Sequence, residues 1–351
     1  MKRLALHPAT DRRHLTLGTG RLPRLSSARV SHELPFVSVI IPTRPGQAKI
    51  DAVSAAQALD YPKERIEILV ARGKQPAIQR NVAIQAARGE LIYFLDDDSH
   101  AAPGNLKRAL DHFKVPNVKM VGGPSLCPAD APALEQVLAV VLSSWLPFGP
   151  SRARYDSVGT ARASSEKELI LCNLIARRDA LLDLGGFNEA LYPNEENALM
   201  DELQKRGAKL IYDPQFIACR RPRPTLRAFS RMLCTYGRGR AEQFRLHPTA
   251  GSLLNFVPPF FCLYLVLEAA LIGAAPGIGV FGLVPLAVYL GLVIVQTLVS
   301  AASKGFVRSL LAMPLVAASP VLYGLGFWRG LFTTLKKKGE KPVTDVVLEK
   351  R

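Results

Sequence analysis

Cysteines are few in this chain of 351 residues, and no two of them stand close together. The five are Cys127, Cys172, Cys219, Cys234 and Cys262, and no C-x-x-C pair is present. A disulfide framework or a zinc site needs clustered cysteine or histidine side chains, so this spacing disfavours both. The sequence therefore predicts reduced thiols.

Acidic residues are also scarce, with 29 Asp and Glu against 45 Lys and Arg and a formal net charge of +16. The excess is partly local: residues 220–245 hold eight arginines and one acid, and residues 329–351 hold seven basic and three acidic side chains. No nucleic-acid-binding motif accompanies these clusters, and both flank long apolar stretches. The charge therefore indicates contact with anionic lipid headgroups on the cytoplasmic side of a membrane, and not with nucleic acid.

Charge is nearly absent from the stretch Leu246–Ser303, in which Glu268 is the only charged side chain. A helix needs about 20 apolar residues to cross the hydrocarbon core of a bilayer. The stretch is long enough for two such helices, with a break near Gly273–Gly277. A buried hairpin of a soluble protein is the alternative, but helices in soluble cores rarely lack charge over such a length.

Ser309–Trp328 is a second uncharged stretch, and Pro314 and Pro320 interrupt it. It fits either one membrane pass or a re-entrant or interfacial segment. Three full passes would leave the basic run Lys336–Lys338 outside, against the positive-inside rule. We therefore favour a re-entrant or interfacial final segment.

The start of the chain lacks the apolar segment of a secretory signal peptide, although Lys2, Arg3, Arg12 and Arg13 are present. The globular part is therefore expected to stay in the cytoplasm. The predicted organisation is a basic disordered arm at 1–34, an α/β domain at 35–245, hydrophobic membrane helices at 246–330 and a basic cytoplasmic tail at 331–351.

Three short apolar, β-branched segments alternate with two helical ones between residues 36 and 95. Continuous apolar runs of this length are typical of strands that are buried on both faces. Strand, helix, strand, helix and strand in this order predict a parallel α/β sheet. The predicted strands are 36–41, 66–70 and 91–95, with one helix ending near Leu59 and the other beginning at Pro76.

Three aspartates, Asp96, Asp97 and Asp98, follow the third predicted strand directly. Ligands bind beyond the carboxyl ends of the strands in open parallel sheets, where the loops 42–46 and 71–75 also converge. Extended geometry puts Asp96 and Asp98 on one face, and carboxylates this close repel one another unless a cation neutralises them. The pattern therefore predicts a site for Mg²⁺ or Mn²⁺. A cap of the next helix is the alternative, whereas the ligand loop of an EF-hand is absent.

Glu195 and Glu196 precede an apolar pattern at Ala198, Leu199 and Leu203. This spacing places both carboxylates at the N-terminus of a helix, where negative charge is favoured. Two interpretations stay open, since the pair is either ordinary first-turn charge or the source of a general base.

Two further features carry no functional prediction. His100 follows the aspartates and is interpreted as a loop residue. The apolar segment 134–148 is about 15 residues long, which is too short to cross a membrane. It is either a core helix or an interfacial helix.

Over Phe36–Gln243 the chain resembles the family 2 glycosyltransferases, which have the GT-A fold. The resemblance implies a GT-A domain with a Rossmann-like, mainly parallel sheet at 35–245. The matching segments are Val37–Arg44, the run from Gln79 to Asp98 that ends in a D-x-D motif, Cys172–Asp179 with Leu184–Glu189, and Tyr192–Leu199, in which Glu196 stands where aspartate is usual.

This resemblance implies roles for individual residues. Asp98 would bind the metal ion directly, and Asp96 would lie near both the ribose and the metal. Glu196, or alternatively Glu195, would be the general base. The donor-binding residues that the resemblance implies are Pro42, Thr43, Arg44, Gly73, Arg80, Asn81, Asp96, Asp97 and Arg238.

The implied activity is the inverting transfer of a sugar from a nucleotide-diphosphate donor to a hydroxyl group of an acceptor. The hydrophobic helices would hold the site at the cytoplasmic face of the inner membrane, which favours a lipid-linked saccharide acceptor. The order of the motifs resembles the bacterial exopolysaccharide branch of the family, in surface polysaccharide synthesis. A UDP-sugar is favoured over a GDP-sugar. The family's usual acidic residue after the second strand contacts the nucleobase, and here Ala71-Arg72-Gly73 stand in its place, so the identity of the nucleobase stays open. A non-catalytic membrane scaffold that binds nucleotide sugars is the alternative, and nucleotide release separates the two.

Overall fold

The computed structural model describes residues 34–191, 194–246, 248, 250–335 and 345–351. The chain divides into two units, 1–34 and 35–351. The predicted basic arm at 1–34 lies outside the described residues, apart from Leu34. The second unit contains the sheets and helices.

The larger sheet has eight strands in the order β11-β2-β1-β3-β8-β5-β9-β7. The neighbours β2, β1 and β3 are parallel, as predicted, and β5 is parallel to β9. Strand β8 runs antiparallel between β3 and β5, and the edge strands β7 and β11 are antiparallel to their neighbours. The strands are β1 (Val37–Thr43), β2 (Ile66–Arg72), β3 (Leu91–Leu95), β5 (Val118–Gly122), β7 (Arg162–Ser164), β8 (Asn173–Arg177), β9 (Lys209–Tyr212) and β11 (Val347–Lys350).

Helices cover both faces of this sheet, so alternate side chains of a strand enter different cores. Ile40 of β1 packs in the core beneath α2, α6 and α7, whereas its neighbours Val39 and Ile41 pack in the core beneath α1 and α3. The uninterrupted apolar sequence of β1 follows from burial on both sides. These helices are α1 (Asp51–Gln57), α2 (Pro76–Ala86), α3 (Asn105–Phe113), α6 (Arg178–Asp183) and α7 (Glu195–Lys205).

A smaller sheet and two short 3₁₀ helices belong to this half of the chain, and a third 3₁₀ helix, η3, directly precedes α9. Strand β10 lies between β4 and β6, antiparallel to the first and parallel to the second. His100, interpreted as a loop residue, forms part of β4. The elements are β4 (His100–Ala101), β6 (Ser125–Leu126), β10 (Ala218–Cys219), η1 (Lys63–Arg65), η2 (Gly149–Arg154) and η3 (Ala250–Phe256).

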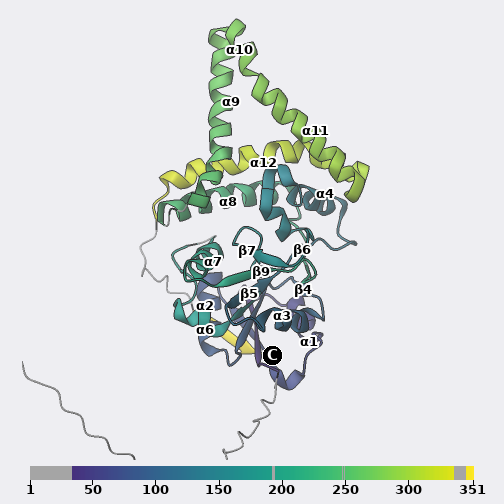
Figure 1. Ribbon diagram of the computed structural model, residues 1–351, viewed down its shortest axis with the longest axis vertical. Helices are drawn as coiled ribbons and strands as arrows, with labels where there is room; N and C mark the ends of the chain where they lie inside the picture. Colours follow the sequence, from purple (N-terminus) through teal and green to yellow (C-terminus); the bar gives the residue numbers. More distant parts are fainter. Residues whose placement is uncertain (1–33, 192–193, 247, 249, 336–344) are drawn as a thin grey trace, which may run out of the picture. The chain divides into compact units, whose positions relative to one another are not determined.

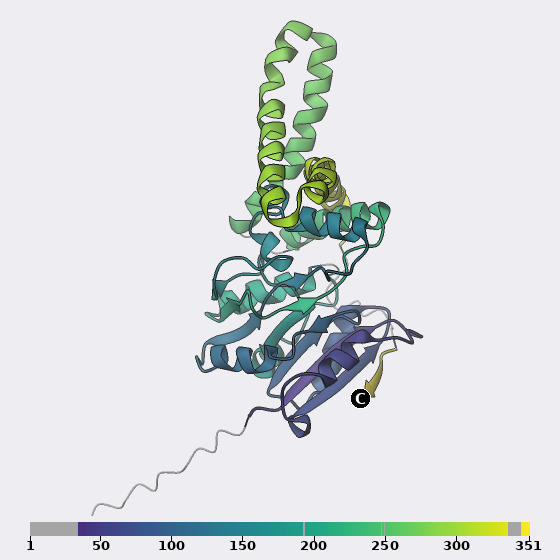
Figure 2. The ribbon, with the colours of Figure 1, turned by 90° about the vertical axis from the view of Figure 1, so that its right-hand side faces the viewer.

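The remaining helices gather at the other side of the molecule from β11. Helix α12 runs along α8 and across α4, while α9 and α11 extend away from them and meet at α10 (Figures 1 and 2). The predicted α/β sheet followed by apolar C-terminal helices is confirmed. These helices are α4 (Ala133–Leu142), α5 (Trp145–Phe148), α8 (Leu226–Leu246), α9 (Val257–Ala274), α10 (Pro276–Gly282), α11 (Val284–Lys304) and α12 (Phe306–Phe332).

The apolar segment 134–148 forms α4 and α5 and packs as a core element. Val137 and Val141 lie in one cluster with Leu233 of α8 and Val316 of α12. Of the two alternatives for this segment, the structure therefore supports a core helix, buried between the α/β half and the apolar helices.

Helices α8 and α12 approach each other closely because glycines line their contact. A Cβ atom on Gly237 of α8 would collide with the backbone of Tyr323, and one on Gly326 of α12 would collide with the backbone of Cys234. The two backbones therefore pack directly against each other, as at small-residue interfaces between helices.

Helix α12 is continuous through Pro314 and Pro320, which excludes a re-entrant hairpin, whereas an interfacial segment and a single membrane pass both fit a continuous helix. A proline leaves the carbonyl four residues earlier without its helical N–H donor. For Pro320 that carbonyl belongs to Val316, and the Tyr289 hydroxyl lies 3.4 Å from it and donates to the Ala317 carbonyl at 2.8 Å. A donor from α11 therefore supports the helix where the proline weakens it.

The C-terminal helices expose apolar side chains on a large scale. Val266, Phe281 and Leu298 are each more than half exposed. The predicted break near Gly273–Gly277 is confirmed, since α9 ends at Ala274 and α10 begins at Pro276. This uncovered surface indicates association with a membrane. The described segments long and apolar enough to span one are Leu253–Ala274, Pro276–Lys304 and Phe306–Phe332.

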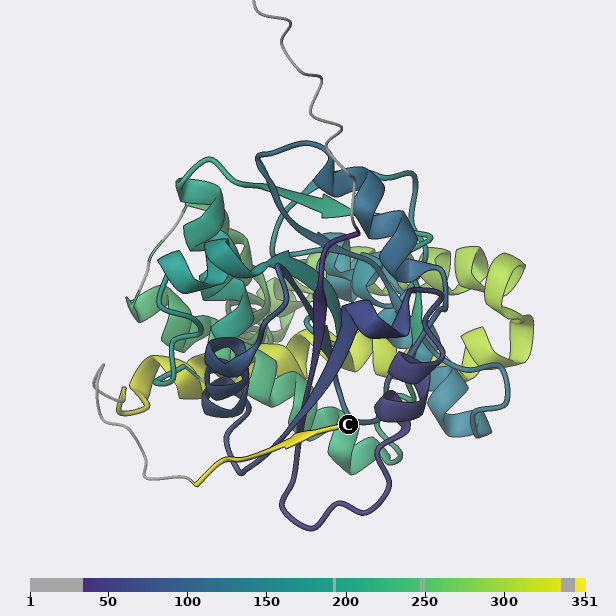
Figure 3. The same cartoon turned by 90° about the horizontal axis from the view of Figure 1, so that it is seen from below.

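The last described residues differ from the predicted basic tail. Val347–Lys350 form strand β11, which pairs antiparallel with β2 at the edge of the sheet (Figure 3). The basic run Lys336–Lys338 lies outside the described residues. Part of the segment predicted as a tail therefore belongs to the α/β half.

Candidate active site

A cavity of about 810 Å³ opens at the carboxyl ends of β1, β2 and β3 and reaches the first turn of α7. The aspartates that follow β3 and the glutamates that begin α7 therefore share one cleft. The predicted site residues that line it are Pro42, Thr43, Arg44, Gly73, Arg80, Asp96, Asp97, Asp98, Glu195 and Glu196.

The floor of the cleft is fixed by Gln79, a buried side chain of α2. Its amide nitrogen donates to the backbone carbonyls of Thr43, at 2.8 Å, and Ala71, at 2.5 Å. These carbonyls end β1 and β2, so one side chain ties the two strands together at the site. A Cβ atom on Gly73 would lie 2.8 Å from Cγ of Gln79, which explains glycine at this position. The Thr43 hydroxyl in turn donates to Asp97 at 2.9 Å.

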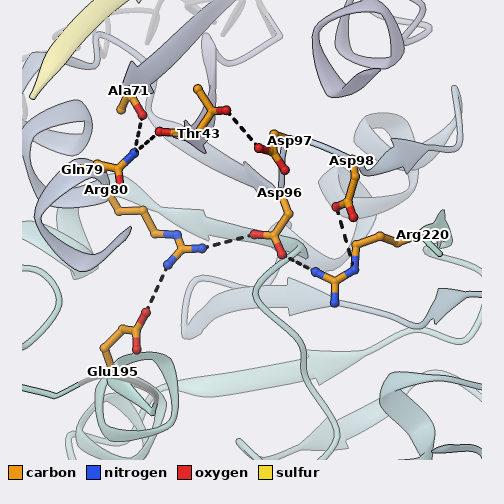
Figure 4. Close-up of polar contacts among 9 residues, drawn as sticks. All are labelled: Thr43, Ala71, Gln79, Arg80, Asp96, Asp97, Asp98, Glu195 and Arg220. Atoms are coloured by element: carbon orange, nitrogen blue, oxygen red, sulfur yellow. Dashed lines mark hydrogen bonds and ion pairs between the residues drawn. The ribbon is translucent and has the colours of Figure 1, made fainter. Parts of the chain in front are cut away.

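A row of alternating charges crosses the cleft (Figure 4). Arg80 contacts Asp96 and Glu195, both at 3.2 Å, and only 6% of Arg80 is exposed. Arg220 contacts the other oxygen of Asp96 and lies 4.0 Å from Asp98. Arg80 therefore links the aspartates to the glutamates, and Arg220 joins two members of the aspartate cluster.

Asp98 is the most open of the three aspartates, with 57% of its side chain exposed to the cleft. The walls still displace much of its water, and this burial raises the pKa of Asp98. The Arg220 guanidinium opposes the rise, while the charges of Asp96 and Asp97 add to it. A carboxylate in this position would gain from a further positive charge beside it.

Glu195 and Glu196 occupy different environments in the same helical turn. Glu195 is only 3% exposed, and its second oxygen accepts the backbone N–H of Asn194 at 3.2 Å. Burial, with the neighbouring charge of Glu196, raises the pKa of Glu195 to about 7, although Arg80 opposes the rise. Glu196 is half-buried and lines the same cleft. The more accessible of the two carboxylates is therefore Glu196.

Asn81 lies outside the cleft and holds a loop. Its amide nitrogen donates to the Phe187 carbonyl at 2.9 Å and to Glu189 at 3.0 Å, and its amide oxygen accepts the Phe187 N–H at 2.8 Å. A Cβ atom on Gly186 would collide with that oxygen. Asn81 therefore positions the segment before α7 and is not among the residues that line the cleft.

Arg238 is also outside the cleft. Its Nε atom lies 3.5 Å from Glu242, one turn further along α8, and its backbone packs against Gly330 of α12. This face of α8 is turned toward α12, which keeps Arg238 from the place that the resemblance implied.

Arg220 is a site residue that was not predicted from the sequence, because the arginines of residues 220–245 other than Arg238 were interpreted as a membrane border. Arg220, Arg221 and Arg223 all line the cleft, and Arg221 pairs with Glu135 of α4 at 2.6 Å. The available signal was the position of Arg220 directly after the short strand β10, as Asp96 follows β3.

The wall opposite the sheet is apolar and comes from α4, α8 and nearby loops. It includes Leu142 of α4 with Met232 and Tyr236 of α8. A second cavity, of about 290 Å³, shares Cys127, Ala139 and Tyr155 with the first and reaches Lys304 and Arg308 at the junction of α11 and α12. The second cavity thus lies between the first and the apolar helices.

The acidic residues fit a divalent cation only together with ligand oxygens. Among the described residues, no group of three or more His, Cys, Asp or Glu side chains could hold a metal ion by itself. Asp96 and Asp98 supply two carboxylates, and Mg²⁺ commonly takes one or two carboxylates together with substrate phosphates. The donor set therefore suits a cation that arrives with a phosphorylated ligand.

Residues 50–135 match the family model described as glycosyl transferase family 2. Two curated relatives, the pre-mycofactocin glycosyltransferases of two Mycobacterium tuberculosis strains, are 28% identical over 180 residues, which cover 50% of this chain and 36% of each relative. The chain thus matches about a third of the relatives' length.

The fold was also compared with solved structures. The mannosyltransferase PcManGT from Pyrobaculum calidifontis, solved with GDP-Man and Mn²⁺, aligns with a TM-score of 0.49 and 16% identity over 85% of this chain and 87% of that one. TarS from S. aureus aligns with a TM-score of 0.40 and 16% identity over 57% of this chain and 38% of that one. The family model and the curated relatives support a family 2 glycosyltransferase, which confirms the resemblance found in the sequence.

Proposed function

We propose that the chain transfers a sugar from a nucleotide-diphosphate donor to an acceptor hydroxyl group, with inversion at the anomeric carbon. The observation that carries this proposal is the shared cleft, in which Arg80 joins the aspartates after β3 to the glutamates of α7. A donor held at one end can present its anomeric carbon to a base at the other. The match to the glycosyltransferase family model supports the same reaction.

In this proposal the nucleotide occupies the end of the cleft formed by Pro42, Thr43, Arg44 and Gly73. The diphosphate lies toward Arg220, which contacts the aspartates and lines the cavity. Positive charge there would stabilise the negative charge that develops on the leaving group. A UDP-sugar is the favoured donor.

Asp98, with Asp96, would hold Mg²⁺ or Mn²⁺ together with the donor phosphates. The cation would supply Lewis-acid stabilisation of the departing diphosphate. Burial raises the pKa of Asp98, so its charged form is poorly stabilised by the cleft alone. A cation that binds with the donor would stabilise that charged form.

Glu196 is the proposed general base. It would take the proton of the acceptor hydroxyl as the hydroxyl oxygen bonds to the anomeric carbon and the bond from that carbon to the diphosphate breaks. Glu195 would hold Arg80 in place, which its burial and its contact with Arg80 support. Glu195 is the alternative base, because its pKa of about 7 also suits proton transfer.

The acceptor is proposed to be a lipid-linked saccharide in surface polysaccharide synthesis at the inner membrane, with the catalytic half in the cytoplasm. The second cavity supports this choice, because it adjoins the catalytic cleft and reaches Lys304 and Arg308 beside the apolar helices. An apolar wall from α4 and α8 suits an acceptor that carries a lipid.

The test is nucleotide release by the full chain in bacterial membranes that supply the acceptor, with a panel of UDP- and GDP-sugars. Release that requires both one donor and the membrane fraction supports the proposal. Binding of a nucleotide sugar without release or transfer would instead identify a scaffold. Transfer to a soluble saccharide alone would overturn the lipid-linked acceptor.

A further inference from the structure

Strand β11 extends the sheet beside the nucleotide end of the proposed donor site. It pairs with β2 from Val347, opposite Arg72, to Lys350, opposite Leu69, and the backbone N–H of Arg351 donates to the Ile68 carbonyl at 2.9 Å. Strand β2 leads directly into the loop that begins with Gly73, which lines the cleft. The C-terminal strand therefore lies against the segment that carries this part of the site (Figure 3).

Two ion pairs join β11 to β2, and they lie at opposite ends of β2. Lys350 reaches Glu67 at 2.9 Å, in the first half of β2. Glu67 is buried, and although burial opposes its ionisation, hydrogen bonds from Ser38, Arg88 and Lys350 lower its pKa to about 2. Because Glu67 keeps two other partners, the Lys350 pair is one of several contacts that satisfy this carboxylate.

The second pair lies at the end of β2 that enters the site. Glu349 contacts Nε of Arg72 at 2.5 Å. Arg72 also donates through Nη1 to the Gln47 carbonyl at 2.8 Å. Gln47 belongs to the exposed loop between β1 and α1, whose earlier residues Arg44 and Pro45 line the cleft.

We propose that Glu349 and Arg72 are positioning residues for the donor, and that β11 braces the nucleotide loop from the edge of the sheet. Glu349 holds the Arg72 guanidinium, and Arg72 holds the loop through Gln47. Neither Glu349 nor Arg72 lines the cleft, so the effect on the donor passes through the loop. The expected effect on donor binding rests on the proposed function, whereas the bracing of the loop by β11 does not.

The structural part is tested by hydrogen–deuterium exchange of the full chain in detergent. Glu349→Gln should increase exchange in the peptide that covers residues 44–50, because the loop loses its brace. Lys350→Gln is the matched control, since it removes the other ion pair of the same strand and should leave that peptide unchanged. Equal exchange in the wild type and in Glu349→Gln would overturn the brace, whether or not the chain is a glycosyltransferase.

The functional part is tested with UDP and GDP binding and with donor kinetics. The Arg72–Glu349 pair is partly buried at the edge of the sheet, and such a pair contributes modestly, so Glu349→Gln and Arg72→Gln should each raise the nucleotide Kd and the donor KM by about threefold to fivefold. The kcat should stay within about twofold, because no group that touches the reacting atoms is altered. The double variant should resemble either single one, since both act through one contact.

The outcomes separate this inference from the proposed function. If the loop exchanges faster in Glu349→Gln but the chain releases no nucleotide from any donor, the structural brace is supported and the proposed enzymatic function is wrong. An unchanged Kd and KM in both variants of an active chain would overturn the positioning role. Circular dichroism of each variant shows whether a loss of fold accounts for the change.

Discussion

The α/β half and the helical half of this chain bury their side chains in opposite ways. Every residue of β1 is buried, and its core is apolar. In α9 and α11 large apolar side chains such as Val266 and Leu298 face outward, while Glu268 and Gln296 are buried. The difference teaches that the two halves have different surroundings: water favours polar surfaces, and lipid favours apolar ones.

The chemistry is expected to reside in the α/β half, and Glu196→Gln gives the largest effect. Loss of the base should lower kcat by about 10²- to 10⁴-fold, with nucleotide binding retained. Glu202→Gln is the control, because Glu202 lies on the same helix but pairs with Arg206 at the surface. Single-turnover transfer measures both variants. Near wild-type turnover in Glu196→Gln would move the assignment to Glu195.

Metal removal should impair nucleotide binding and transfer in the α/β half and should leave the helical half unchanged. EDTA should abolish transfer, and Asp98→Asn should remove the increase in nucleotide affinity that Mn²⁺ causes, by about tenfold or more. Calorimetry of UDP and GDP binding with and without Mn²⁺ measures the difference. Without Mn²⁺, the nucleotide affinity of Asp98→Asn should match that of the wild type. Full activity in EDTA would rule out the metal role.

The helical half should be most sensitive where two backbones meet. Gly326→Leu forces a side chain against the backbone of Cys234 and should destabilise the α8–α12 contact by about 1–3 kcal/mol or more. Gly291→Leu is the matched control, since nothing lies within 4 Å of a Cβ atom there. Thermal unfolding in detergent compares the two. Similar unfolding temperatures would mean that α8 and α12 do not pack as described.

The smallest expected effect is a dependence of stability on pH. Burial raises the pKa of Glu195 from 4.5 to about 7, so the folded chain binds more protons than the unfolded chain in this window. The contribution of Glu195 is therefore fully present below pH 4.5 and is lost as the pH rises through 7. Glu195→Gln should flatten the fall in unfolding temperature between pH 5 and 7, by about the amount that the titration of one group contributes. Asp201, whose pKa burial raises to about 6, should account for a remaining slope.

Local patterns predicted the first three strands, their two helices and the break at residues 273–277, because each depends on neighbours in sequence. Strand β11 was not predictable in this way. It contains Glu349 and Lys350 among few apolar residues, and its partner β2 lies nearly the whole chain away. Its pairing is a tertiary contact with no sequence period to reveal it.

The candidate site shows the same division. Thr43 and Asp96 follow strands that the sequence revealed, and the structure places both in the cleft. Arg220 and Arg238 belong to one arginine-rich segment, yet only Arg220 reaches the aspartates. Arg220 directly follows β10, whereas Arg238 lies where α8 packs against α12, and that packing depends on glycines whose partners lie on another helix. The donor that supports α12 near Pro320 likewise comes from another helix, from Tyr289 of α11.

Helix α8 touches the catalytic cavity with Met232 and Tyr236 and abuts α12 at Gly237, one residue further on. Helices α8 and α4 thus lie between the cavity and the apolar helices. Under the proposed function, their thickness would set a fixed height between the lipid surface and the attacking hydroxyl, so that acceptors would be selected by how far their sugar stands above the bilayer.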